Sequence, residues 1–168
     1  MTDVVIADEQ VQLVDSRNRP RGSAARRTMR RLACWHRATY VIVRNATGHI
    51  CVQQRTLHKE TYPGAFDLAA GGVVGAGEAS LPAARRELAE ELGISGVRLD
   101  GGHTFRFAED GLHAFGSVYW VHYDGALQLQ ASEVAAVRWL SLGQALALEA
   151  ATPDTRVALA LAARENGW

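Results

Sequence analysis

Residues Gly71–Ile94 read GGVVGAGEASLPAARRELAEELGI and carry the clearest structural signal in the chain. Ser80 is a favourable N-cap, and Pro82 falls in the first turn, where proline is tolerated. Gly93 stands where a C-terminal glycine cap belongs. The sequence therefore predicts a helix from about Leu81 to Leu92. Apolar residues recur on it at three- and four-residue steps and predict a buried stripe, at Leu81, Ala84, Leu88 and Leu92.

The glutamates of this helix lie away from the apolar stripe. Because a helix turns by about 100° per residue, Glu87 and Glu91 project about 40° apart and one turn from each other. Glu90 points further round, near Arg86, and Glu78 precedes the helix close to its N-terminus. Like charges four residues apart destabilise a bare helix by about 0.2–0.5 kcal/mol per pair. A bound divalent cation would remove that penalty.

Carboxylate oxygens are hard ligands, which favours magnesium or manganese over zinc. The glycine-rich approach to the helix lets the backbone come close to a metal or a phosphate, and the carbonyl of Gly71 can be a further ligand. A solvated acidic helix face is the alternative interpretation, and ELAEEL alone would favour it. The complete spacing does not: it reads G-x5-E-x7-R-E-U-x-E-E-x-G-U with U apolar, and every fixed position is filled, by Gly72, Glu78, Arg86, Glu87, Leu88, Glu90, Glu91, Gly93 and Ile94.

This pattern is the Nudix box, and the chain resembles the Nudix hydrolase superfamily. It is most similar to the branch that contains YfcD-like hydrolases and type 1 isopentenyl diphosphate isomerases. The similarity covers nearly the whole chain and includes HRATYVIV (36–43), QQRTLHKETYPGAFD (53–67) and EVAAVRWL (133–140). The resemblance implies a Nudix fold of the α+β class, with a mixed sheet sandwiched between helices. It also implies a metal-dependent diphosphatase with Mg²⁺ as cofactor and Mn²⁺ as the alternative.

Transferred onto this sequence, the box implies that Glu87, Glu90 and Glu91 bind the metal and that Glu78 is a lesser ligand or contacts one. Arg86 is expected to orient a box glutamate through a salt bridge. Water would attack phosphorus with the metal offsetting the diphosphate charge. The general base is expected to be Glu90 or Glu133, although Glu133 can equally be an ordinary loop carboxylate.

Arg55 and Lys59 match an arginine and a lysine that contact the substrate diphosphate in the isomerases; an exposed loop pair is the alternative. His36 matches an isomerase metal ligand, but the other partners of that site are missing. Gly71 replaces the catalytic cysteine, and Leu112 and Ala114 replace carboxylates. Without a thiol and an opposing acid, alkene isomerisation lacks its proton carriers, so His36 is expected to be structural.

Three functions therefore stay open: a hydrolase of nucleoside di- or triphosphates or nucleoside diphosphate derivatives, an isomerase-like prenyl diphosphate enzyme, and a non-catalytic nucleotide-binding module. The intact box favours the first. Substrate choice is expected to depend on the loops 56–66 and 105–113, where Tyr62, Phe66 and Phe107 can stack on a base or belong to the core.

The bulk properties agree with a single domain over residues 1–168, with an amino-terminal hairpin extension over about residues 8–35. The 18 basic and 18 acidic residues balance, so total charge gives no reason to expect nucleic acid or an acidic membrane as partner. Arginines crowd residues 17–37, as a phosphate-binding patch or, more simply, as a solvated arm. Cys34 and Cys51 form no metal motif, and no apolar run or signal-like amino terminus stands out, which favours a cytoplasmic protein. A homodimer is possible, but the sequence does not decide it.

Elsewhere the sequence predicts a short helix at 26–32, strands mainly in the middle and two helices at the carboxyl end, the second capped by Thr152 with Pro153 at its first position. The strands are predicted at Val11–Asp15, Thr39–Arg44, His49–Gln53, Phe66–Ala70, Val97–Phe107, His113–Tyr123 and Val137–Leu140.

Overall fold

The computed structural model describes residues 8–168. The amino-terminal residues 1–7, part of the stretch that lacks a signal-peptide pattern, lie outside the described residues. The strands form one mixed sheet, in which β3 (His36–Arg44) runs parallel to β8 (Leu112–His122) while the other ladders are antiparallel. The remaining strands are β1 (Gln10–Val14), β2 (Pro20–Ala25), β4 (Ile50–Arg55), β5 (Phe66–Asp67), β6 (Ala70–Val73), β7 (Asp100–Glu109) and β9 (Val134–Leu140).

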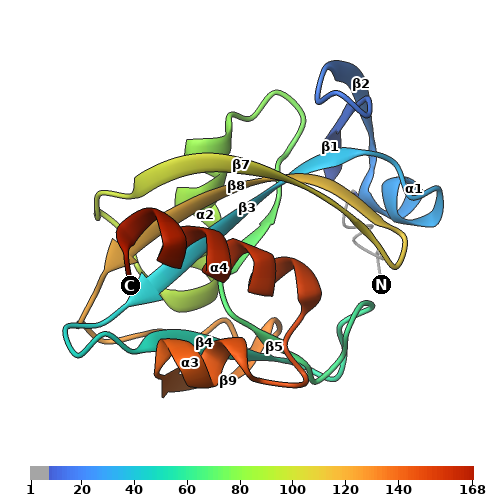
Figure 1. Ribbon diagram of the computed structural model, residues 1–168. Coiled ribbons are helices and arrows are strands. Elements are labelled where there is room, and N and C mark those ends of the chain that lie inside the picture. Colours follow the sequence, from blue (N-terminus) through green and yellow to red (C-terminus); the bar gives the residue numbers. More distant parts are fainter. Residues whose placement is uncertain (1–7) are drawn as a thin grey trace.

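Strand β3 holds the sheet together, because it pairs with β1, β4, β6 and β8. Strand β7 continues the sheet beyond β8, and β9 and β5 continue it beyond β4 (Figure 1). Strand β6 pairs with β3 and leads directly into the loop that precedes the box helix. The glycines of that strand therefore lie beside the central strand of the sheet.

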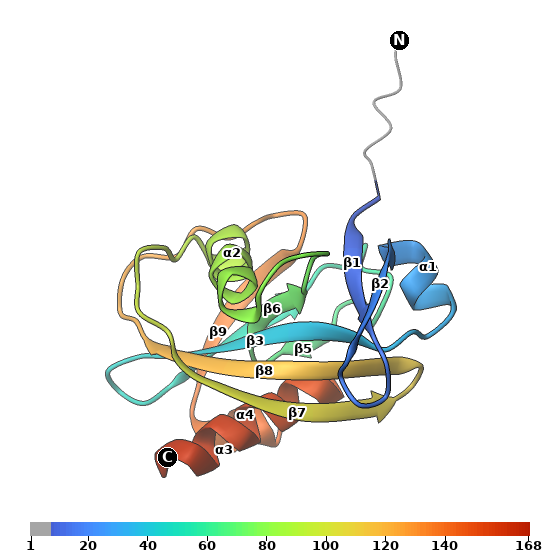
Figure 2. The same ribbon diagram turned by 90° about the horizontal axis from the view of Figure 1, so that it is seen from above.

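Helices cover both faces of the sheet, as the alternation of side chains along β3 requires. Val41 and Val43 face α2 (Ser80–Leu92) in one core cluster with Ala84, Leu88 and Leu92. Tyr40 and Ile42 face the opposite way, toward α4 (Pro153–Asn166) and α3 (Leu142–Leu146). Figure 2 shows α2 on one side of β3 and β8 and α4 on the other. The predicted α+β class and the sheet between helices are confirmed.

The amino-terminal hairpin of β1 and β2 leads into α1 (Arg26–Arg31). Its apolar anchor is a small cluster in which Val11 of β1 and Met29 of α1 pack against Val73 of β6. Asp15 holds the connecting turn, where its carboxylate accepts hydrogen bonds from the backbone amides of Arg17 and Arg19. The hairpin and α1 are thus fastened to the strand that carries the box glycines.

Local signals located the helices well and some strand limits less well. The box helix ends at Gly93 in the left-handed conformation, as predicted, but its N-cap is Ala79 and not Ser80. The Ser80 hydroxyl accepts a hydrogen bond from Ser117 instead of capping the helix. Thr152 does occupy the N-cap of α4, although its hydroxyl donates to Asp67.

The predicted strand Phe66–Ala70 was wrong in its limits, because the chain changes partners within it: β5 pairs with β4, and β6 pairs with β3. Strand β7 starts at Asp100 and not at Val97, since the residues before it form the connection from α2. In residues 8–168, the longest helices are too short and too polar to cross a lipid bilayer.

Candidate active site

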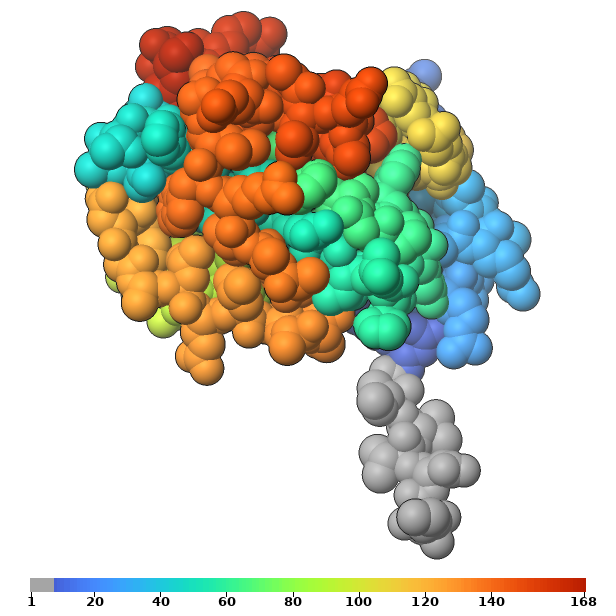
Figure 3. Space-filling view, turned by 90° about the horizontal axis from the view of Figure 1, so that it is seen from below, coloured from blue at the N-terminus to red at the C-terminus, as the bar shows by residue number. Residues whose placement is uncertain are grey.

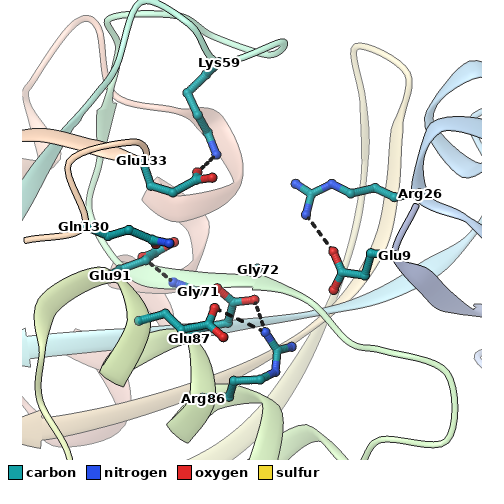
Figure 4. Close-up of a pocket in the computed structure, with 11 residues that line it drawn as sticks. Glu9, Arg26, Lys59, Gly71, Gly72, Arg86, Glu87, Glu91, Gln130 and Glu133 are labelled. Atoms are coloured by element: carbon teal, nitrogen blue, oxygen red, sulfur yellow. Dashed lines mark hydrogen bonds and ion pairs between the residues drawn. The ribbon is translucent and has the colours of Figure 1, made fainter. Parts of the chain in front are cut away.

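The helix glutamates of the box and the glycines of β6 line a cavity of about 320 Å³ (Figure 4). Helix α2 supplies the acidic wall, because its apolar stripe is buried against the sheet and its glutamates are turned toward β6. Segments distant in sequence supply the remaining walls. The lining residues are Glu9, Arg26, Lys59, Gly71, Gly72, Arg86, Glu87, Glu90, Glu91, Gln130 and Glu133.

Arg86 contacts three of the four box glutamates. Its guanidinium donates to Glu78 at 2.9 and 3.0 Å and to Glu87 at 2.9 Å, and lies 3.5 Å from Glu90. The hydrogen bonds from Arg86 hold the pKa of Glu78 below its usual value. Arg86 therefore gathers these carboxylates on one side of the cavity, which is the position expected of a residue that orients them.

Glu91 is bound from the sheet side. Its Oε2 accepts hydrogen bonds from the Gly71 amide at 3.2 Å and from the Gln53 side chain at 3.3 Å. Burial, reinforced by the charge of Glu87, raises the pKa of Glu91 well above its usual value. Burial also raises the pKa of Glu87. A cation beside these two carboxylates would offset both effects.

The donor set fits a hard divalent cation such as Mg²⁺, because it consists of carboxylate oxygens concentrated on one wall. Within residues 8–168, however, no three His, Cys, Asp or Glu side chains converge in an arrangement that could hold a metal ion. Arg86 contacts Glu78, Glu87 and Glu90, whereas Glu91 contacts Gly71. The ligand set stays a prediction.

The two glycines of β6 are required by close approach. A Cβ atom on Gly72 would lie 2.7 Å from Oε1 of Glu87. A Cβ atom on Gly71 would lie 1.8 Å from the carbonyl oxygen of Thr39. The observed contact of Gly71 with the site is its N–H group on Glu91, and ligation through its carbonyl stays a prediction.

Lys59 and Glu133 form an ion pair on the wall opposite Arg86. Residues 74 positions apart are brought together because Lys59 lies in the loop after β4 and Glu133 immediately precedes β9, the partner of β4. Arg55 lies nearby, donating to Asp67 at 2.7 Å and to the Thr61 carbonyl at 2.9 Å.

A larger cavity of about 620 Å³ adjoins the first and shares Arg26, Lys59, Gly71, Gly72 and Glu91 with it. Arg55 lines this second cavity, as does His36. His36 is buried, its Nδ1 lies 3.0 Å from the Cys34 carbonyl, and burial lowers its pKa. These contacts agree with the structural role expected of His36.

Two hydrogen-bonded pairs line the larger cavity. Tyr40, in the central strand, donates a 2.7 Å hydrogen bond to Asp154 at the start of α4. Tyr62 donates to Asp110 at 3.2 Å, joining the loop after β4 to the turn between β7 and β8. Burial raises the pKa of Asp154, so its carboxyl group is a poorly hydrated acceptor facing the cavity.

Comparison with protein families matches residues 35–161 to the NUDIX domain model. The chain belongs to the Nudix family. Among its Nudix relatives, the Uncharacterized Nudix hydrolase PA4841 of Pseudomonas aeruginosa is 41% identical over 158 residues, covering 91% of this chain and 92% of the relative. The Uncharacterized Nudix hydrolase YfcD of Escherichia coli K12 is 40% identical over 159 residues, covering 94% and 88%. The predicted YfcD-like branch is therefore confirmed.

Solved Nudix structures share the fold. DR0079 from Deinococcus radiodurans superposes with a TM-score of 0.80 at 26% identity, covering 91% of this chain and 98% of that one. The NUDIX domain of Shewanella oneidensis NrtR, solved with ADP ribose, superposes with a TM-score of 0.65 at 18% identity, covering 80% and 89%, and shows the fold alone.

The helix glutamates of the box, Arg86, Lys59 and Glu133 line the smaller cavity and Arg55 lines the larger one, while the roles expected of them stay predictions. The two cavities are also lined by residues that no local motif marks, among them Glu9, Arg26, Arg30, Tyr40, Gln130 and Asp154. Arg26 did carry a signal, since it belongs to the arginine-rich early segment. That segment was more simply explained as a solvated arm, and only the packing of α1 against β6 reveals which of its arginines face the cavities.

Proposed function

We propose that this Nudix protein hydrolyses a diphosphate linkage in a nucleoside di- or triphosphate or a nucleoside diphosphate derivative, by attack of water on phosphorus. The observation that carries the proposal is the single cavity in which all the fixed helix glutamates of the box face Lys59 and the glycine backbone of β6. A chain with an acidic wall, a cation opposite and a backbone amide between them can hold a diphosphate and a metal together.

In this proposal Glu87, Glu90 and Glu91 hold the metal ion, with Glu78 held near them by Arg86. A divalent cation bound there, Mg²⁺ or Mn²⁺, supplies charge neutralisation for the diphosphate and lowers the pKa of a bound water. Arg86 holds the carboxylates in place when the cavity is empty, so their side chains need to move less when metal and substrate bind.

We expect Glu133 or Glu90 to act as the general base that accepts the proton of the attacking water. Glu133 lines the cavity and is paired with Lys59, so a substrate phosphate that takes Lys59 would release the carboxylate of Glu133 toward the water. Glu90 is the most exposed of the box glutamates, with 48% of its side chain accessible, and it has only a long contact to Arg86. Both residues are therefore free to exchange partners.

The contacts argue against a prenyl diphosphate isomerase. A thiol at position 71 would need a Cβ atom where the Thr39 carbonyl lies. Leu112 and Ala114 offer no carboxylate. The polar Tyr40–Asp154 pair facing the larger cavity suits a group with hydrogen-bond donors better than an alkene chain.

The decisive experiment is a screen with Mg²⁺ or Mn²⁺ over nucleotides, nucleotide sugars, dinucleoside polyphosphates and coenzymes, with ADP-ribose included. Glu91→Gln is expected to reduce kcat/KM on any substrate found by at least about 100-fold, because one acceptor and one charge leave the metal-binding wall. Glu149→Gln changes an exposed carboxylate outside both cavities and is the matched control. Equal rates for Glu91→Gln and the wild type would refute the assignment.

A further inference from the structure

Helix α1 lies outside the segment that matches the Nudix model, yet it forms a wall of both cavities. The family match begins at residue 35, whereas α1 spans Arg26–Arg31. Arg26 lines both cavities and Arg30 lines the larger one. Met29 anchors the helix in the cluster with Val11 and Val73, so these arginines have fixed positions. Both cavities are therefore completed by residues that lie outside the segment matched by the family model.

Arg30 meets Arg55 in the wall of the larger cavity. Both guanidinium groups donate to the same oxygen, the Thr61 hydroxyl, at 3.5 Å from Arg30 and 3.3 Å from Arg55. A neutral hydroxyl cannot offset two positive charges. Figure 3 shows the blue segment that contains α1 beside the green loop that contains Thr61.

The two arginines differ in how their charges are balanced. Arg55 has Asp67 at 2.7 Å, and both side chains are largely buried. Arg30 has Glu60 at 3.8 Å, and 81% of that glutamate side chain is exposed, so its contribution is small. Burial, together with the charge of Arg26, lowers the pKa of Arg30. The cavity wall thus holds a half-buried guanidinium, beside a second one, with little negative charge to match it.

We propose that Arg30 and Arg55 form an anion subsite that binds a phosphoryl group of the substrate in the larger cavity. This rests on the proposed function for the identity of the ligand, since the scissile diphosphate would lie next door between Lys59 and the box glutamates. Guanidinium groups bind phosphate oxygens through two parallel hydrogen bonds, and two of them from different elements fix its orientation. Arg30 contributes the half of this subsite that precedes the segment matched by the family model.

The probe is inorganic diphosphate, titrated calorimetrically into the full-length protein in metal-free buffer. Arg30→Gln is expected to weaken its binding by about tenfold or more, because one charge-assisted contact is lost. Arg30→Lys keeps the positive charge but loses the planar guanidinium group. Its affinity for diphosphate is expected to lie between those of the wild type and Arg30→Gln. Arg27→Gln is the matched control: it removes an arginine from the same helix whose side chain is 87% exposed, and binding should not change.

Melting temperatures of the four proteins establish that each is folded under the titration conditions. Equal diphosphate affinity in wild type and Arg30→Gln, or the same loss in Arg27→Gln, would overturn the subsite. So would a wild type that binds no diphosphate. If diphosphate binding depends on Arg30 but the protein hydrolyses no substrate in the screen, the subsite is supported and only the proposed function is refuted. With a hydrolysed substrate in hand, Arg30→Gln should raise KM and leave kcat nearly unchanged.

Discussion

Gly71 and Gly72 let β6 lie against the carboxylates of α2 and the backbone of β3 at once. The side chain of any other residue at position 72 would displace the Glu87 carboxylate, and at position 71 it would meet the β3 backbone. A carboxylate can rotate away, whereas a paired strand backbone can move only with its sheet. Substitutions at the two positions are therefore expected to have different effects. A substitution of Gly72 should lower activity, whereas a substitution of Gly71 should lower the stability of the fold.

Gly71→Ala is expected to lower the free energy of unfolding by about 3 kcal/mol, the upper range for an overpacked interior, because its Cβ would lie 1.8 Å from the Thr39 oxygen. Urea denaturation followed by circular dichroism measures the change. Gly143→Ala in α3 is the control, since a Cβ there meets nothing within 4 Å and should be neutral or stabilise by about 0.5–1 kcal/mol. A Gly71→Ala protein as stable as the control would show that β6 can move away from β3.

Among the elements, α2 was predictable because its signals are local: Pro82 near its start, Gly93 at its end and an apolar stripe between them. The error at Ser80 came from a tertiary partner, Ser117, which no local pattern contains. The same reason explains the strand at 66–70, which the sheet divides between two partners. The residues that line the cavities show the same contrast: the spacing of the box marks its glutamates, whereas only the packing of α1 shows that Arg30 faces the larger cavity.

The β1–β2 hairpin depends on one carboxylate. Asp15 accepts hydrogen bonds from the Arg19 and Arg17 amides and from the Arg19 side chain, which lower its pKa from 3.8 to about 2. A pKa depressed by folding stabilises the folded state above pH 3.8 and loses that effect as pH falls toward 2. Asp15→Asn should therefore melt at a lower temperature than wild type at pH 7, and the difference should shrink between pH 4 and pH 2.

Thermal melts of both proteins over this pH range test the hairpin prediction. Asp100→Asn is the comparison variant, because its ion pair with Arg98 at 3.2 Å is mostly exposed and should matter less. A wild-type–Asp15→Asn difference that stays constant down to pH 2 would mean that the charge of Asp15 does not hold the turn.

At the scale of the whole molecule, the two helical layers are separate cores joined by β3. Alternate residues of that strand belong to the α2 cluster and the α4 cluster, so both helical layers pack against the same strand. Tyr40 of β3 donates a hydrogen bond from its hydroxyl to Asp154 at the start of α4, which is 114 residues away in the sequence. The contact fastens the carboxyl-terminal helix to the sheet at the edge of the larger cavity.

Tyr40→Phe tests this link by removing one oxygen atom. The variant leaves the half-buried Asp154 carboxyl without its side-chain donor, so the free energy of unfolding should fall by about 1–3 kcal/mol. Tyr123→Phe removes an equivalent hydroxyl whose 2.8 Å bond to the Ala126 carbonyl is exposed, and it should cost less than about 1 kcal/mol. Chemical denaturation of both variants compares them directly. Equal decreases in the free energy of unfolding for the two variants would mean that water replaces the Tyr40 hydroxyl at Asp154. The larger cavity would then admit solvent as far as Asp154.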